Sequence, residues 1–207
     1  MLEKSFLFGY NGIEIQLLRI GEMIFMEWNA KKIEIHLEKV TYDNIDEVRK
    51  LRVAKDQRDF VASNDWSLIQ AYLSLDEGEP VYPFAICNGK KVVGFIMINY
   101  ANKWGGYKRE AWLNSDTYRF YKDRYYYYIW RFMIDKKYQN RGYGREALKR
   151  AIEFVKTAPC GEAEFCVLSY EPKNEVAKKL YFSLGFAELN GPGYYEEDDE
   201  ISAVLKL

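Results

Sequence analysis

The 207-residue sequence contains few of the residues that build disulfide frameworks or zinc sites. Its three cysteines, Cys87, Cys160 and Cys166, are odd in number, and no C-x-x-C motif occurs. This pattern does not indicate a disulfide framework. The single histidine, His36, cannot complete a zinc cluster with them, so we expect no metal. The cysteine pattern favours a reducing, cytoplasmic setting.

The sequence also lacks a strong net charge and a long apolar run. The net charge is −1, so no overall field attracts nucleic acid or an anionic membrane. Charged residues interrupt every apolar stretch near the N-terminus, namely Glu3, Lys4, Glu14, Arg19 and Glu22. Neither a signal peptide nor a membrane span is therefore expected. With 48% hydrophobic and 29% charged residues, the composition is that of a globular protein.

Residues 1–32 are interpreted as an N-terminal extension whose role the pattern does not define. Gly12–Ile20 and Met23–Trp28 are predicted to be short strands around Gly21-Glu22. We hypothesise that Met26 is the natural start of the chain. The main domain is expected to span residues 33–207.

The first part of this domain alternates between strand and helix patterns. Ile33, Ile35 and Leu37 alternate with polar residues, which predicts a strand. Two helices are then expected, the first capped by Asp43 and the second by Asn64 or Asp65. Their apolar positions are Ile45, Val48 and Leu51 in the first, and Trp66, Ile69, Tyr72 and Leu73 in the second.

The middle of the domain is rich in strand formers. Val81–Cys87 and Val92–Tyr100 are predicted to form a hairpin through an Asn88-Gly89 turn. Residues 101–124, rich in Lys, Arg, Trp and Tyr, are interpreted as an inserted loop. A further strand is expected over Tyr125–Ile134.

The last part predicts two helices and three strands. Gly144–Thr157 has an apolar stripe formed by Ala147, Leu148, Ala151, Ile152 and Val155, with Arg145, Lys149 and Arg150 outside it. Strands are predicted over Ala163–Ser169, Phe186–Leu189 and Ile201–Leu207. Between the first two, Pro172 is expected to open a helix that ends at Gly185, with Val176, Ala177, Leu180 and Leu184 on its buried side. The whole order indicates a mixed α/β sheet.

The most specific motif is Gln139-Asn140-Arg141-Gly142-Tyr143-Gly144, between a predicted strand and a predicted helix. Glycines allow the backbone to approach a phosphate, and the N–H groups and dipole of the helix N-terminus favour an anion. The motif lacks the Gly-Lys-Ser/Thr of a Walker loop and the third glycine of a dinucleotide fingerprint.

The spacing Gln139-x-x-Gly142-x-Gly144 resembles the Q/R-x-x-G-x-G/A pyrophosphate loop of GNAT acetyltransferases. Downstream, Asn174, Ala177, Leu180-Tyr181 and Leu184-Gly185-Phe186 resemble the second cofactor motif of that family. The resemblance covers about residues 33–207. It implies an α/β fold with a GNAT-type mixed, mostly antiparallel central sheet flanked by helices. It also implies N-acetyltransferase activity with acetyl-CoA as cosubstrate.

The resemblance assigns roles to particular residues. The CoA pyrophosphate would be held by backbone N–H groups of the loop, which belong to Arg141, Gly142, Tyr143, Gly144 and Arg145. Gln139 would shape the beginning of the loop, and Asn174 would bond the cofactor. The strand residues Phe132, Met133 and Ile134 would carry the pantetheine arm, and a backbone N–H near Met133 would polarise the thioester carbonyl.

Tyr181 is the predicted general acid. It lies seven residues after Asn174, close to two helical turns, so the two side chains share a face. A thiolate leaving group needs a proton, which a phenol can supply. The sequence leaves the general base open, with Glu171 and Glu79 as candidates.

The acceptor is expected to be a small primary amine. Phe60–Tyr72 resembles the second-helix region of bacterial spermine/spermidine acetyltransferases, which favours a polyamine. Carboxylates that would attract a polycation occur at Asp76, Glu77, Glu79 and 196–200. Alternative acceptors are an aminoglycoside, an amino acid or a protein N-terminus. A CoA-binding regulatory module without turnover and an interaction module that uses the aromatic insertion are further alternatives. The resemblance is also compatible with a homodimer.

Overall fold

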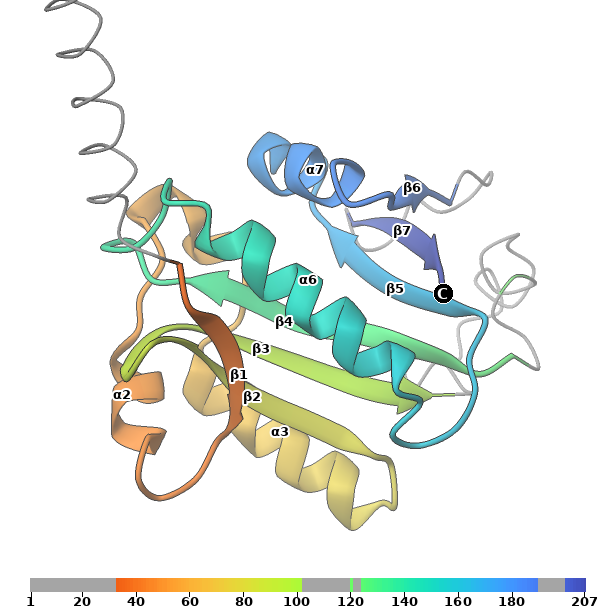
Figure 1. Cartoon of the computed structure of the whole chain (residues 1–207), viewed down its shortest axis with the longest axis horizontal. Helices are drawn as coiled ribbons and strands as arrows, with labels where there is room; N and C mark the ends of the chain where they lie inside the picture. Colours follow the sequence, from red (N-terminus) through yellow and green to blue (C-terminus); the bar gives the residue numbers. More distant parts are fainter. Residues whose placement is uncertain (1–32, 102–119, 121–123, 190–199) are drawn as a thin grey trace, which may run out of the picture. The chain divides into compact units, whose positions relative to one another are not determined.

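A computed structural model describes residues 33–101, 120, 124–189 and 200–207 (Figure 1). The predictions for residues 12–28, most of the insertion and residues 196–199 fall outside these ranges. The chain divides into two compact units, Met1–Ile33 and Glu34–Leu207. This division lies one residue from the boundary expected from the sequence.

The second unit is built on a seven-stranded sheet in the order β1-β2-β3-β4-β5-β7-β6. Its strands are β1 (Ile35–Lys39), β2 (Val81–Asn88), β3 (Lys91–Ala101), β4 (Tyr126–Ile134), β5 (Phe165–Tyr170), β6 (Ala187–Glu188) and β7 (Ile201–Lys206). The β4–β5 pair is parallel and the other neighbouring pairs are antiparallel. The predicted mixed, mostly antiparallel sheet is therefore confirmed.

Helices cover both faces of this sheet. They are α2 (Ile45–Lys50), α3 (Asn64–Asp76), α6 (Tyr143–Lys156) and α7 (Glu175–Phe182), with a 3-10 helix, η1 (Lys55–Phe60), between α2 and α3. Residues of α6 and α7 share one core with one face of the strands, and residues of α2 and α3 share a second core with the other face (Figure 1). The predicted order of strands and helices is confirmed, and η1 is an addition to it.

The apolar stripe of α6 packs as its periodicity predicted. Ala147, Leu148, Ala151 and Val155 are buried, whereas Arg145, Lys149 and Arg150 are exposed. Helix α3 differs, because the apolar positions Trp66, Ile69, Tyr72 and Leu73 are each at least 50% exposed. Its buried residues are Asn64, Ser67 and Ala71. Helix α3 therefore contacts the sheet mainly through small side chains, with Leu68 as a half-buried large residue packed against the same core.

The predicted caps of α2 and α3 are wrong by one or two residues. Asn44, not Asp43, is the N-cap of α2. Ser63 caps α3, and its Oγ accepts a hydrogen bond from Trp66 N at 3.2 Å. Asn64 does not cap the helix; its buried Nδ2 donates a hydrogen bond to Val48 O at 2.8 Å and so links α3 to α2. This tertiary bond competes with capping and is invisible in a local pattern.

Two other local predictions also need correction. Helix α7 begins after Asn174, whose Oδ1 accepts from Ala177 N at 3.1 Å, so Pro172 lies in the preceding turn. Val176 of this helix is 69% exposed rather than buried. In the hairpin, Asn88 pairs with Lys91, so the two-residue turn is Gly89-Lys90. Gly89 takes φ 55° at the first central position, as in type II′ turns.

The three cysteines are free thiols, as the absence of a disulfide pattern predicted. Within the described residues, no helix has the length and hydropathy needed to cross a bilayer.

Candidate active site

A cavity of about 830 Å³ lies where β4 and β5 separate. The two strands pair only over Tyr126–Ile129 and Phe165–Leu168. Beyond this point β5 continues as a partner of β7 and turns away from β4 (Figure 1). The cavity is lined by the separated strand ends and by residues of η1, α6 and α7. Its volume is in the range of small-molecule and cofactor sites.

The N-terminus of α6 opens into this cavity with unpaired N–H groups. Gly142 is the N-cap and has φ 80°, a left-handed conformation that favours glycine. The first helical bond of the segment runs from Glu146 N to Gly142 O at 3.2 Å. The N–H groups of Tyr143, Gly144 and Arg145 precede it and have no acceptor in the helix. Together with the helix dipole they fit a phosphate group.

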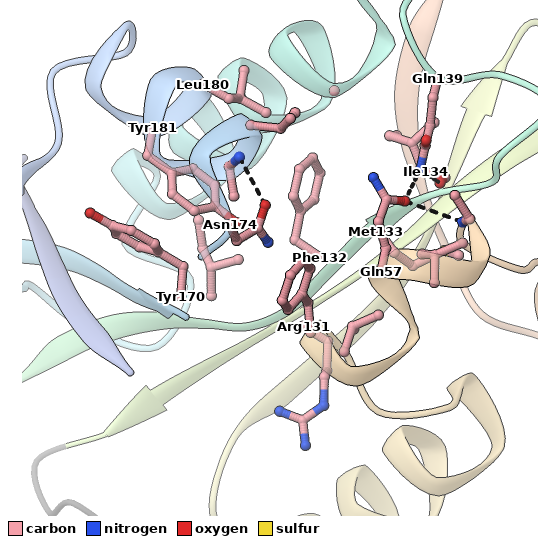
Figure 2. A pocket seen from close by; sticks show the side chains of 18 of the residues that line it. Gln57, Arg131, Phe132, Met133, Ile134, Gln139, Tyr170, Asn174, Leu180 and Tyr181 are labelled. Atoms are coloured by element: carbon pink, nitrogen blue, oxygen red, sulfur yellow. Dashed lines mark hydrogen bonds between the residues drawn. The ribbon is translucent and has the colours of Figure 1, made fainter. Parts of the chain in front are cut away.

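Gln139 fixes the beginning of this loop. Its Nε2 donates to Gln57 Oε1 at 2.7 Å and to Ile134 O at 3.1 Å (Figure 2). Gln57 Oε1 also accepts from Ala54 N at 3.2 Å. The end of β4 is thereby tied to η1. Sequence reasoning found Gln139 but missed Gln57, because no local pattern relates residues 82 positions apart.

The structure brings most of the predicted site residues to one cavity. Its lining includes Phe132, Met133, Ile134, Gln139, Gly142, Gly144, Arg145, Asn174 and Tyr181. Arg141 and Tyr143 are not among the lining residues. The Arg141 guanidinium lies 5.7 Å from the centre of the Tyr138 ring. The Tyr143 side chain is buried in the core, where its hydroxyl accepts from Asn88 Nδ2 at 3.0 Å. From this position Tyr143 can offer a ligand only its backbone.

Helix α7 presents Asn174 and Tyr181 to the cavity from the same side (Figure 2). The Asn174 carbonyl oxygen caps the helix, which leaves its amide nitrogen for other partners. Tyr181 is only 7% exposed and lies against Tyr170 and Phe186, with ring centres 5.7 Å and 6.1 Å away. Burial, and then the negative charge of Glu200, raise the pKa of Tyr181 above its ordinary value. Its hydroxyl therefore stays protonated at neutral pH.

Sequence reasoning missed a polar chain on the opposite side of Tyr181. Ser169 Oγ donates to Glu200 Oε2 at 2.5 Å, and the hydroxyls of Ser169 and Tyr128 are 2.8 Å apart. All three residues line the cavity. Nothing local in the sequence reveals this group, because it depends on β7 pairing with β5.

Of the carboxylates named from the sequence, those at 196–199 lie outside the described residues, and among the others only Glu200 lines the cavity. Glu171 and Glu79, the candidate bases, do not line the cavity, and neither do Asp76 and Glu77. Glu79 lines a separate hollow together with Gly78 and Pro80. The two base candidates therefore lose their geometric support.

His36 belongs to a group of three residues with metal-binding side chains. Ligand atoms of His36, Glu38 and Cys87 lie within 4.8 Å of one another. His36 Nε2 is 2.8 Å from Glu38 Oε1, and burial raises the pKa of the Cys87 thiol to about 12. A structural zinc site takes four ligands and a thiolate rather than a thiol. We assign no metal to this group.

Comparison with family models places the same segments in a known family. The model of the Acetyltransferase (GNAT) family matches residues 42–186. This range is 145 of 207 residues and includes the glycine loop and α7. No curated protein matches the chain.

Solved structures show the same fold at low sequence identity. NAA60 of Arabidopsis thaliana, in complex with a bisubstrate analogue, has TM-score 0.54 and 14% identity, covering 83% of this chain and 97% of that one. The PaiA N-acetyltransferase of Thermoplasma acidophilum, in complex with coenzyme A, has TM-score 0.53 and 12% identity, covering 84% and 99%. A domain from Methanocaldococcus jannaschii has TM-score 0.55 and 13% identity, covering 85% and 100%.

Proposed function

The chain belongs to the GNAT family of acetyltransferases, and we propose that it transfers the acetyl group of acetyl-CoA to a primary amine by direct attack. One observation carries this proposal. The opening between β4 and β5 brings the unpaired N–H groups of α6 and the protonated hydroxyl of Tyr181 to one cavity. These are the two functions that a thioester donor requires, an anion site and a proton for the thiolate.

The glycine loop and α7 supply the donor site in this proposal. Backbone N–H groups of the loop bind the pyrophosphate, and Arg145 adds a charge-assisted bond at the cavity wall. The Asn174 amide bonds the pantetheine arm. Beyond Ile129, the edge of β4 that faces the opening has no strand partner on the β5 side, so it offers backbone groups to that arm.

The direction of the backbone in β4 identifies the group that polarises the thioester carbonyl. Asp135 N donates to Val93 O of β3 at 2.9 Å, whereas the Ile134 carbonyl accepts from Gln139 on the other side. Successive residues of a strand present their backbone groups to alternate edges. Met133 N–H therefore faces β3, and Phe132 N–H faces the opening. We assign the carbonyl contact to Phe132 rather than to Met133.

Two side chains complete the proton transfers. Tyr181 gives its proton to the departing thiolate, whose ordinary pKa is about 8.5. Glu200 accepts the proton of the attacking amine, directly or through a water molecule. Two observations support this role: Glu200 lines the cavity, and its charge acts on the pKa of Tyr181.

The experiment is thiol release from acetyl-CoA with a panel of spermidine, spermine, putrescine, lysine, free amino acids, a peptide and an aminoglycoside. CoA binding is measured in parallel by calorimetry. Amine-dependent release supports the proposal. CoA binding without release on any amine would favour the regulatory module, and no CoA binding would refute the donor site.

The panel also tests the polyamine prediction. Of the carboxylates on which this prediction relied, Asp76, Glu77 and Glu79 do not line the cavity, whereas Glu200 does. Asp56 and Asp59 also line it. Polyamine turnover at least tenfold above that of the other acceptors would support the prediction. The peptide tests the protein N-terminus alternative.

A further inference from the structure

Arg131 of β4 is a cavity residue with a special backbone position. Met97 pairs with Arg131, and Ile98 pairs with Ile129, so Trp130 is the extra residue of a bulge. Bulges redirect the side chains beside them. The Arg131 side chain extends away from Phe132 toward α3 (Figure 2). There its Nη2 donates to Gln70 Oε1 at 2.9 Å.

Among the described residues, Arg131 forms no ion pair, although the more distant charge of Glu200 acts on its guanidinium in the direction that raises its pKa. Its Nη1 donates to Trp130 O at 2.8 Å, and its guanidinium lies 5.1 Å from the centre of the Trp130 ring. These partners and Gln70 are neutral. The buried Nε has no hydrogen-bond partner. Desolvation lowers the pKa of Arg131 from its ordinary value, but an arginine remains charged.

A half-buried arginine with no ion-pair partner and a buried, unsatisfied Nε costs stability, so its presence in a cavity needs an explanation. Asn64 shows how this fold treats a buried polar group whose role is structural, because its amide is hydrogen-bonded to Val48. The Nε–H of Arg131, in contrast, donates no hydrogen bond to any described residue. An arginine fork matches a carboxylate in geometry and charge.

We propose that Arg131 binds a carboxylate of the acceptor, so that the acceptor is an amine that also carries a carboxylate, in the class of free amino acids. The inference rests on the proposed acetyl transfer and narrows its substrate. Glu200 lines the same cavity and its charge acts on Arg131 from a distance, without an ion pair between the two side chains in the described part of the chain. The two opposite charges are therefore separated, as a zwitterionic acceptor requires, with its amine at Glu200 and its carboxylate at Arg131.

The surroundings of Arg131 argue against two other acceptors. A polyamine has only positive groups and would meet an unneutralised cation. An internal peptide amide cannot replace the carboxylate, because it brings no negative charge. The η1 side of the cavity includes the apolar Val53, Phe60 and Val61 beside the carboxylates Asp56 and Asp59, so an apolar side chain of the acceptor would find apolar partners there.

The first test needs no variant. Thiol release is measured with leucine, methionine and phenylalanine and with their carboxamides, which differ only in the carboxylate. We expect kcat/KM to be about 100-fold higher for the acids, the effect of one charge-assisted pair in a desolvated site. Equal values for acids and amides, or turnover of polyamines or the peptide alone, would refute the inference and leave acetyl transfer intact. No release with any amine would overturn both proposals.

The second test removes the charge. Arg131→Gln should lower kcat/KM for the acids about 100-fold, mainly through KM, and change it less than threefold for the amides. Arg131→Lys keeps the positive charge but loses the planar guanidinium fork, so its kcat/KM for the acids should lie between those of the unmodified protein and Arg131→Gln. Arg150→Gln, on the exposed face of α6, is the matched control. An equal loss for acids and amides would show a structural role, and thermal unfolding and CoA affinity report whether the variants fold.

Discussion

The two halves of the cavity are built in different ways. We call the N-terminus of α6 with its loop (139–145), Phe132–Ile134 and α7 the donor half. Residues of η1 together with Arg131, Ser169 and Glu200 form the acceptor half. The donor half relies on backbone groups of short contiguous segments, whereas the acceptor half relies on side chains from elements far apart in the chain. If the proposed function is right, local geometry binds the cosubstrate and tertiary contacts select the acceptor.

The largest expected effect is that of Tyr181→Phe, which removes the acid at the junction of the two halves. We expect kcat to fall by about 100-fold or more, the usual contribution of general acid catalysis, with CoA affinity unchanged. Thiol release and calorimetry measure the two quantities. Tyr82→Phe, whose hydroxyl contacts Cys160 outside the cavity, is the control. A normal kcat in Tyr181→Phe would remove this residue from the chemistry.

Glu200→Gln tests the acceptor half alone. At pH 7 we expect kcat/KM to decrease about 10- to 100-fold, because the amine loses its proton acceptor. The deficit should shrink as pH rises and the free amine becomes abundant. Glu79→Gln is the matched control, since Glu79 does not line the cavity. A deficit that stays constant from pH 6 to 9 would contradict a role as base.

Gly142→Ala tests the donor half alone. An alanine at φ 80° costs about 1 kcal/mol, and the shifted loop should weaken CoA binding about fivefold. Gly144→Ala is the informative partner. A Cβ there would lie no closer than 3.4 Å to Leu180, so we expect gained helix stability. Calorimetry and thermal unfolding compare the two, and equal CoA affinities would speak against the loop geometry.

The smallest expected effect concerns the pH profile of kcat, in which Tyr181 should cause no decline at high pH. A raised pKa keeps Tyr181 in its protonated, proton-donating form beyond the ordinary value of about 10. The rate should therefore rise from pH 6 to 9, as the amine deprotonates, and show no decline from Tyr181 below pH 10. A pH profile of kcat on a buffered series measures this. A declining limb near pH 8 that disappears in Tyr181→Phe would show that the pKa is not raised.

Much of the fold could be predicted from periodicity. The stripe of α6 and the alternation of β1 reflect burial on one face, whereas the continuous apolar runs of β2 and β3 reflect burial on both faces; a sequence records either pattern residue by residue. Helix starts were less accurate. Ser63 caps α3, where Asn64 or Asp65 was expected, and Asn174 caps α7, where Pro172 was expected to open the helix. Several capping residues adjoin one another, and tertiary bonds select among them.

The sequence by itself determined the family and the order of strands and helices along the chain, and it predicted the donor half, because backbone anion binding needs only glycines and a helix start in contiguous positions. Only the tertiary structure decided the acceptor half. It placed Glu200 beside Ser169 through the β5–β7 pairing, and Gln57 against Gln139. It also placed Arg131 at the cavity with its Nε lacking a hydrogen-bond partner among the described residues. These contacts depend on side-chain positions in space, and the separation of their residues along the chain conceals them from any local pattern.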